Sequence, residues 1–215
     1  MSFLQGNPEE WLPGLIELGD IMVDSLIPEA WPECREKMRG EICHEDAVTK
    51  VFVRQLHKAK KKICPRMSFQ IISQHPVYPS DDDTGIIDIV VMFGGDEDYY
   101  LGYECKWLEK KRDKKSDSGL VGEYLGEGGL GCFLSGKYAP CMPVGYMVGY
   151  VASGDVAVAE AKVEARMERR KMPSPENRRQ VGEMRFSQAC YRRNAPLQNI
   201  VIGHIFLPYK HNSFH

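Results

Sequence analysis

Residues 85–107, GIIDIVVMFGGDEDYYLGYECKW, decide the fold class of this chain. Two runs in this stretch, 86–93 and 99–107, are rich in Ile, Val and aromatic residues, which favour β-strands. The glycines and the aspartate at 94–96 form a turn signal between them. The stretch therefore predicts two adjacent strands that pair as a hairpin.

The candidate catalytic residues lie on these two strands. Asp88 stands among apolar neighbours, where an unpaired carboxylate is costly to remove from water. Alternate side chains of a strand share a face, so Glu104 and Lys106 point to the same side. In a hairpin Asp88 and Glu104 converge on one divalent cation, and oxygen ligands of this kind suit Mg²⁺ or Mn²⁺. The main-chain carbonyl of Cys105 is a further candidate metal ligand.

A metal ion at this position would lower the pKa of a bound water and neutralise charge that develops on a phosphodiester. Lys106 would lie beside that water and stabilise the transition state. The alternative interpretation is structural: a buried Asp88–Lys106 ion pair with Glu104 in solvent. The two interpretations predict different surroundings for Glu104.

An amphipathic helix is predicted upstream, over residues 41–59. Val48, Val51, Phe52 and Leu56 recur at helical spacing, and Pro65 stops continuation. Glu45 precedes Val48 by three residues and Phe52 by seven, so it shares their inward face. Glu45 is therefore a fourth candidate site residue, with helix capping as its structural alternative.

Further elements follow from the same patterns. Strands are predicted at 67–73, 145–152 and 199–207, and residues 108–143 are predicted to be a basic, glycine-rich loop. Asp155 is a candidate N-cap for a helix that ends before Pro173. The order helix, three strands, loop, strand, helix, strand predicts an α/β domain whose mixed central β-sheet is flanked by helices.

Residues 1–40 are predicted to be an acidic, helical N-terminal elaboration, interrupted by Pro13 and Pro28, on a domain formed by residues 41–215. Residues 1–49 carry eleven acidic and three basic side chains. Trp11 and its apolar neighbours in this acidic region favour a partner, either a second copy of the chain or another protein subunit such as an ATPase.

Basic residues cluster at 50–66, 106–115 and 162–193, although the net charge of the whole chain is −2. Such clusters bind phosphates, and the alternative is a solvated surface. Lys110 and Lys111, in the second cluster, are candidate nucleic-acid contacts.

The composition, with 43% hydrophobic and 27% charged residues, excludes wholesale disorder. The sequence has no apolar run of the roughly 20 residues that a membrane span needs and no signal-peptide pattern at its start, so we expect a cytoplasmic protein without membrane contact. Seven cysteines without paired spacing predict reduced, mostly buried thiols, and the histidines, His204 among them, show no metal spacing.

Glu45, Asp88 in GIIDIVV, and Glu104-Cys105-Lys106 in YYLGYECKW together resemble the PD-(D/E)XK superfamily of nucleases, also called restriction-endonuclease-like, over roughly 41–207. The resemblance implies a four-stranded mixed sheet flanked by helices. It also implies that Asp88 and the Glu-x-Lys motif ligate Mg²⁺ and act in catalysis, with Glu45 completing the site. The superfamily's signature proline is absent, because Ile87 precedes Asp88.

The segment GLGCFLSGKYAPCMPVGYMVGYV also resembles small members of that superfamily, through Phe133, the Gly-Lys-Tyr at 136–138 and the Gly-Tyr-Val at 149–151. Cys132 stands where those members have arginine. Lys137 and Tyr138 are candidate contacts to a phosphate and to a base or sugar, and the alternative is a loop that closes over the sheet.

The resemblance implies a magnesium-dependent nuclease that cuts DNA rather than RNA, with defence against foreign DNA as a plausible role by analogy of fold. The alternative function is a non-catalytic binding or scaffolding subunit of a larger assembly.

Overall fold

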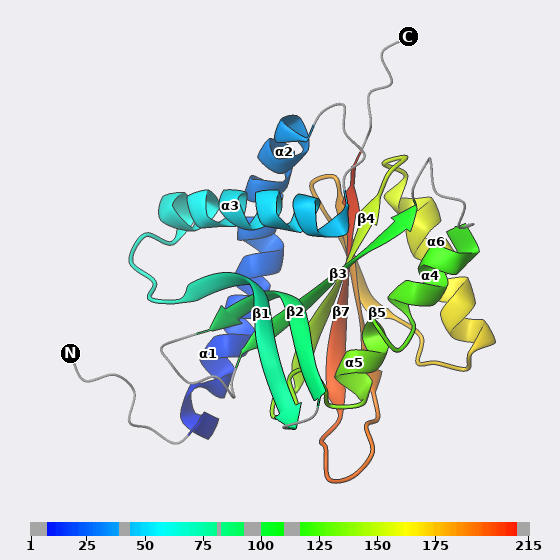
Figure 1. Ribbon diagram of the computed structural model, residues 1–215. Helices are drawn as coiled ribbons and strands as arrows, with labels where there is room; N and C mark the ends of the chain where they lie inside the picture. Colours follow the sequence, from blue (N-terminus) through cyan, green and yellow to red (C-terminus); the bar gives the residue numbers. More distant parts are fainter. Residues whose placement is uncertain (1–7, 39–43, 81–82, 93–99, 110–116, 210–215) are drawn as a thin grey trace.

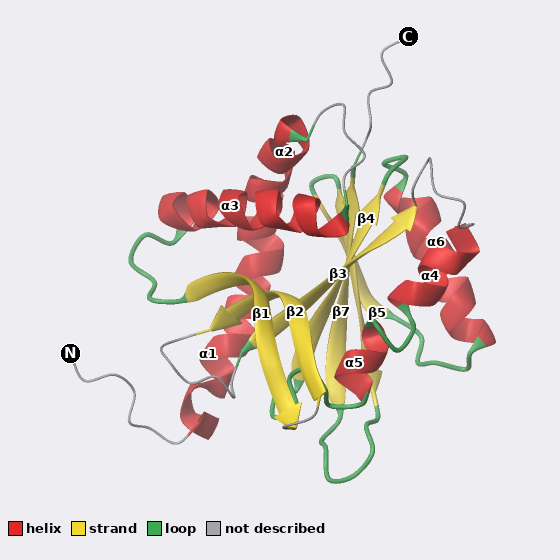
Figure 2. Cartoon of the chain, in the orientation of Figure 1, coloured by secondary structure: helices red, strands yellow, loops and turns green. Residues whose placement is uncertain are grey.

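The computed structural model describes residues 8–38, 44–80, 83–92, 100–109 and 117–209 (Figures 1 and 2). Six α-helices and one π-helical turn are found there: α1 Pro8–Ile21, η1 Met22–Leu26, α2 Ile27–Lys37, α3 Glu45–Ile63, α4 Asp117–Tyr124, α5 Leu130–Leu134 and α6 Val156–Arg169. The same residues also form seven β-strands: β1 Gln70–Ser80, β2 Asp83–Met92, β3 Leu101–Glu109, β4 Val144–Val151, β5 Glu176–Val181, β6 Met184–Tyr191 and β7 Ile200–Pro208.

The strands form one mixed sheet in the order β1-β2-β3-β4-β7-β6-β5. The first three strands are antiparallel neighbours, whereas β4 runs parallel to both β3 and β7. The β5–β6 hairpin joins the far side through antiparallel pairing of β6 with β7. Parallel central strands are normally covered on both faces, and every residue of β4 is buried.

Helices cover both faces of the sheet (Figure 1). On one face Trp31 of α2 stacks on Tyr150 of β4 at a centroid distance of 5.5 Å. On the other face the Tyr124 hydroxyl of α4 donates to the carbonyl oxygen of Met147 in β4 over 3.3 Å. The predicted α/β class with a mixed sheet flanked by helices is therefore confirmed.

The amphipathic patterns located several elements to within a few residues. The helix predicted over 41–59 is α3, which ends at Ile63 before Pro65; residues 41–43 lie outside the described ranges. The Asp155 side chain caps α6 as expected, because its Oδ1 accepts from the Val158 N–H over 3.1 Å.

The predicted element order was incomplete in two places. The β5–β6 hairpin was missed because β5, with the sequence ENRRQV, is an exposed edge strand without an apolar alternation. The turn signal was present, since Gly182 has a φ of +60° between the two strands. The stretch predicted as a loop contains α4 and α5, whose glycines weaken the helical pattern.

The N-terminal helices α1, η1 and α2 follow one another directly and form one continuous helical rod, which the prolines do not break. Pro13 lies inside α1, and the wide η1 turn leads into α2, where Pro28 occupies a first-turn position that needs no N–H. The rod packs into the same hydrophobic core as the sheet. The Trp31 Nε1–H donates to the Pro208 carbonyl over 2.9 Å, so α2 is tied to the end of β7.

The six described cysteines are free, and four of them are buried, as the sequence predicted; Cys43 lies outside the described ranges. No helix in the described part of the chain is long and apolar enough to cross a membrane.

We predict that Trp31→Ala lowers the free energy of unfolding by about 3–5 kcal/mol, because it removes a large buried ring and leaves a cavity against Tyr150. Ile16→Ala, at a side chain that is 42% exposed, is the control and should cost far less. Urea unfolding measures both. A loss below 1 kcal/mol for Trp31→Ala would mean that α2 is not part of the cooperative unit.

Candidate active site

The candidate site lies where β2 and β3 separate. The two strands pair only from Val91–Leu101 to Ile89–Tyr103. Beyond Tyr103, β3 continues alongside β4 alone, as far as Glu109. The divergence leaves backbone N–H groups of β3 without a partner strand on the side that β2 has left.

Two acidic side chains bind these N–H groups. Asp88 Oδ2 accepts from the Cys105 N–H over 2.8 Å, and Glu45 Oε2 accepts from the Trp107 N–H over 2.9 Å. Alternate N–H groups of a strand point to the same side, so the two carboxylates line one edge of β3. Glu45 reaches this edge from the first turn of α3. Asp88 and Glu45 are thus brought to β3, the strand that carries Glu104 and Lys106.

Lys106 lies at the centre of this cluster. Its Nζ is 2.5 Å from Glu104 Oε1, 3.1 Å from Glu45 Oε1 and 4.0 Å from Asp88 Oδ2. It also donates to the Cys105 carbonyl oxygen over 3.1 Å. Asp88 and Glu104 therefore both approach the Lys106 ammonium. Glu104 is not in solvent, since its side chain is only 5% exposed.

The carboxyl groups are held in an environment that disfavours their charge. Burial raises the pKa of Asp88 to about 6, although Lys106 and the Cys105 N–H oppose the shift. Burial and then the charge of Asp88 raise the pKa of Glu104 to about 8. Burial lowers the pKa of Lys106, but the surrounding carboxylates outweigh it and raise that pKa overall. Three carboxyl groups thus surround a single ammonium.

The donors present fit a divalent cation. Glu104 Oε2 is buried and has no hydrogen-bond partner among the described residues, and such an oxygen is costly unless a ligand binds it. Asp88, Glu104 and the Cys105 carbonyl are hard oxygen ligands of the kind that Mg²⁺ prefers. In the described part of the chain no three His, Cys, Asp or Glu side chains are grouped to hold a metal. A site of two carboxylates and one carbonyl would not form such a group.

A local backbone irregularity faces Asp88 from β1. Gln74 falls between Ser73 and His75, which pair with Ile89 and Ile87 on either side of Asp88, and has a φ of 51°. The left-handed region is uncommon for a residue other than glycine inside a strand. Unusual backbone conformations of this kind cluster near functional sites.

A groove with a volume of about 510 Å³ opens beside Lys106. Its other lining residues belong to α4 and to the turn that follows it, and four of them are glycines. The sequence identified this stretch only as glycine-rich. Its position against Lys106 depends on the packing of α4 on the sheet, where Tyr124 is buried.

The loop after α5 carries two further candidates. Tyr138 is buried, and its hydroxyl donates to the Ile86 carbonyl over 2.7 Å, which agrees with the alternative of a loop that closes over the sheet. Lys137 is partly exposed on the same loop. Cys132, in place of the expected arginine, donates from Sγ to the Glu127 carbonyl over 3.1 Å.

Buried Arg193 fixes this loop. Its guanidinium donates to the carbonyl oxygens of Ala139, Pro140 and Met142, over 3.0–3.2 Å, and also to that of Gln198. Nothing in the sequence marked Arg193 beyond its place in a basic cluster. Lys110 and Lys111 lie outside the described residues.

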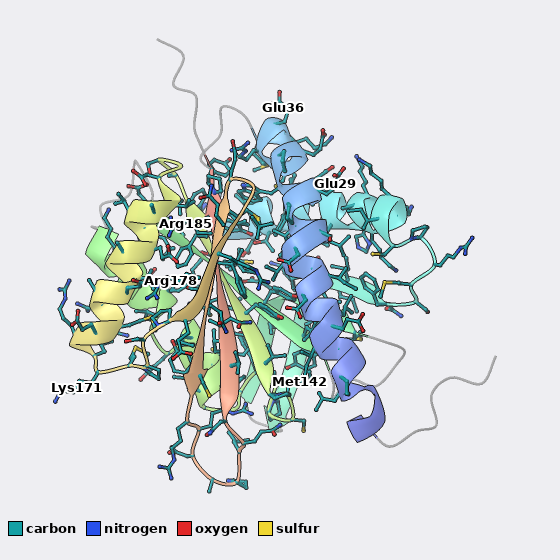
Figure 3. The ribbon with its side chains drawn as sticks, turned by 180° about the vertical axis from the view of Figure 1, so that it is seen from behind. Glu29, Glu36, Met142, Lys171, Arg178 and Arg185 are labelled. Atoms are coloured by element: carbon teal, nitrogen blue, oxygen red, sulfur yellow. The ribbon has the colours of Figure 1, made fainter. Side chains whose placement is uncertain are left out.

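Three arginines of the basic cluster at 162–193 form ion pairs within the protein. Arg178 pairs with Glu164, Arg179 with Asp24, and Arg185 with Glu160. Seen from behind, Arg178 and Arg185 lie beside α6 (Figure 3). Arg178 and Arg185 therefore serve ion pairs with α6, and Arg179 serves one with η1.

His204 is a residue of the protein core. It is fully buried, with Nδ1 3.0 Å from the Tyr124 hydroxyl and Nε2 3.2 Å from that of Tyr191. Burial lowers its pKa to about 4, so the ring is neutral at pH 7.

Comparisons with family models, with curated proteins and with solved structures give no match to this chain. The function is therefore inferred from the geometry of the site.

We predict that the metal-free protein loses about 2 kcal/mol of stability between pH 6.5 and 8.5 through Glu104. The folded-state pKa of Glu104 is about 8 against an ordinary value of 4.5. The folded protein therefore releases a proton in this range that the unfolded chain has already lost. Urea unfolding across the range should show a flatter profile for Glu104→Gln, and equal slopes would contradict the assignment.

We further predict that Mg²⁺ raises the melting temperature more at pH 8.5 than at pH 6.5. Protons compete with the metal for Asp88 and Glu104, whose pKa values are raised. Glu104→Gln and Asp88→Asn should abolish the shift, whereas Glu168→Gln, on the exposed part of α6, should retain it. A shift that is independent of pH or that survives both substitutions would place the ion elsewhere.

Proposed function

We propose that this protein is a magnesium-dependent nuclease of the PD-(D/E)XK, or restriction-endonuclease-like, class, which hydrolyses phosphodiester bonds in DNA. The proposal rests above all on one observation. Three carboxyl groups and one lysine meet at the divergence of β2 and β3, and the pKa values of Asp88 and Glu104 are raised there. Strongly perturbed groups that share a partly open site are typical of catalytic centres.

The excess of carboxyl groups argues against a purely structural ion pair. Lys106 needs one acidic partner to be neutralised, yet three acids surround it, and one oxygen of Glu104 is left without a partner among the described residues. An arrangement of this kind costs stability. A bound cation offsets that cost.

The order of the elements also supports the proposal. The superfamily that the sequence resembles has a four-stranded mixed sheet flanked by helices. Strands β1 to β4 are neighbours in that order, with α3 before them and α4 and α5 between β3 and β4. Asp88 lies on the second of these strands, and Glu104 and Lys106 lie on the third.

Each residue has a distinct part in the proposed reaction. Asp88, Glu104 and the Cys105 carbonyl would hold the cation, which when bound would supply a water of lowered pKa and neutralise phosphate charge. Glu45 holds the backbone of β3 at Trp107 and positions the Lys106 ammonium. Lys106 orients the attacking water and stabilises negative charge on the phosphate in the transition state.

The proposed partner is a nucleic acid, with Lys137 and the basic cluster at 50–66 as the described phosphate contacts. Lys110 and Lys111 belong to the same proposal from outside the described residues. Three further proposals rest on the sequence: a second copy of the chain or another subunit as a partner, a role in defence against foreign DNA, and a cytoplasmic location.

We predict that Lys106→Ala lowers the rate of Mg²⁺-dependent DNA cleavage by about 10²–10³-fold, because it removes one charged donor from the transition state. Affinity for DNA should change far less, since Lys106 is one contact among many. The assay uses duplex DNA, single-stranded DNA and RNA. Lys37→Ala, at an exposed lysine in the acidic N-terminal segment, is the control and should cleave like the wild type.

Undiminished cleavage by Lys106→Ala would contradict its catalytic role. If the wild type, with Mg²⁺ or Mn²⁺, cleaves none of the three substrates and Lys106→Ala changes only the melting temperature, the cluster is structural. The chain is then better described as a non-catalytic binding or scaffolding subunit.

A further inference from the structure

The outer side of α3 carries a row of exposed cations. They recur at spacings of four, four and three residues, so they lie on one side of the helix, away from the sheet (Figure 1). We call this row the basic face of α3; it consists of Lys50, Arg54, Lys58 and Lys61. Its length along the helix axis is about 17 Å.

The protein does not neutralise this face. Residues 47–80 contain neither Asp nor Glu. Two other lysines of the last turn have partners: Lys60 donates to the Phe69 carbonyl oxygen, and Lys62 pairs with Glu29 over 2.7 Å. The four cations of the basic face, in contrast, form no ion pair with any residue in the described part of the chain.

The stability of the helix does not explain these charges. Cations are favourable near the end of a helix, which accounts for Lys61 in the last turn. Lys50, Arg54 and Lys58 lie in earlier turns, and like charges four residues apart destabilise a helix. On α6, by comparison, acidic side chains pair with neighbouring arginines. A row of cations that is left unpaired favours an anion from outside the chain.

The dimensions and chemistry of the basic face fit a phosphate backbone. One strand of duplex DNA carries a phosphate about every 3.4 Å along the axis, so the face spans roughly five phosphates. A helix that binds a membrane surface needs apolar side chains to insert. Val48, Phe52 and Leu56, the apolar side of α3, are fully buried in the core. DNA therefore fits this face better than an anionic membrane does.

The basic face has few groups that read bases. Asn and Gln recognise adenine in the major groove, but Gln55, the only amide side chain of α3, is buried. Thr49, the only hydroxyl of the helix, is buried as well. Contacts between cations and phosphates carry no sequence information. Binding at this face should therefore be independent of base sequence.

The same helix also contributes to the candidate active site, from its opposite side. Glu45, in the first turn, accepts from the Trp107 N–H and so points toward the sheet. Lys50, where the basic face begins, is exposed. The basic face is therefore separate from the carboxylates around Lys106, and it would hold DNA away from the bond that is cleaved.

We propose that the basic face of α3 is an exosite that binds the phosphate backbone of duplex DNA, independently of base sequence and of the divalent cation. The inference rests on the proposed function for the identity of the ligand. Contacts at such an exosite are the same in the ground state and in the transition state, so they act on affinity and KM rather than on the chemical step.

Two triple variants with the same net charge form the test. The test variant carries Lys50→Gln, Arg54→Gln and Lys58→Gln. The control carries three substitutions at exposed positions outside α3, Lys37→Gln, Lys171→Gln and Arg192→Gln. Glutamine is about as good a helix former as lysine or arginine, and the test variant loses repulsion along α3, so its melting temperature should not fall.

The first measurement is the affinity for duplex DNA without metal, at several salt concentrations. We expect the test variant to bind at least tenfold more weakly than the wild type, with a slope of log K against log salt that is less steep by about 2–3. The control should stay within threefold of the wild type. Two duplexes of equal length and unrelated sequence should bind the wild type equally.

The second measurement is cleavage with Mg²⁺. The test variant should have a kcat/KM at least tenfold below that of the wild type, chiefly through a higher KM, and should retain the melting shift with Mg²⁺. Lys106→Ala, in contrast, should act chiefly on kcat.

The possible failures are distinguishable. If the wild type cleaves DNA and the test variant behaves like the control, the exosite is overturned and the nuclease proposal stands. Equal losses in both triple variants would mean that net charge governs binding, which also overturns the exosite. If the wild type binds DNA through α3 but cleaves no nucleic acid, the exosite stands and the proposed function fails. Tighter binding to vesicles of anionic phospholipid than to DNA would overturn the choice of ligand.

Discussion

The binding of the β3 backbone by two carboxylates is the interaction on which the candidate site depends. Where β2 leaves β3, the N–H groups of Cys105 and Trp107 lose their strand partner, and Asp88 and Glu45 accept from them instead. An unsatisfied buried N–H is costly, so the strands can separate only where such acceptors are supplied. The same carboxylates then stand around Lys106. The opening in the sheet and the cluster of charges therefore have one cause.

This arrangement explains why the cluster is poorly neutralised. The positions of Asp88 and Glu45 are set by the backbone groups that they bind, and that of Glu104 by the face of β3 that it shares with Lys106. A single ammonium cannot satisfy all three, and Glu104 Oε2 remains without a partner among the described residues. Residual negative charge in a partly buried site attracts a cation, which links the backbone geometry of the sheet to the proposed metal-dependent chemistry.

Around this centre the rest of the chain acts as support. The N-terminal rod and α3 cover one face of the sheet, and Trp31, Thr49 and Tyr150 connect them: Trp31 stacks on Tyr150, whose hydroxyl lies 3.0 Å from Thr49 Oγ1. On the other face α4 is fixed by the Tyr124–His204 contact, which places its glycines beside Lys106. Arg193 holds the loop that carries Lys137.

The sequence by itself determined the α/β class, α3, the central strands and the four residues of the cluster, because each depends on a local pattern: helical or strand periodicity, or a charge that is misplaced among apolar neighbours. The tertiary structure alone decided that Lys106 pairs with three acids rather than with Asp88 only, that Glu45 binds the backbone of β3, and that Arg178, Arg179 and Arg185 pair with acids of other elements. These features depend on contacts between residues tens of positions apart in the chain, and on where two paired strands separate, which periodicity within one segment does not encode.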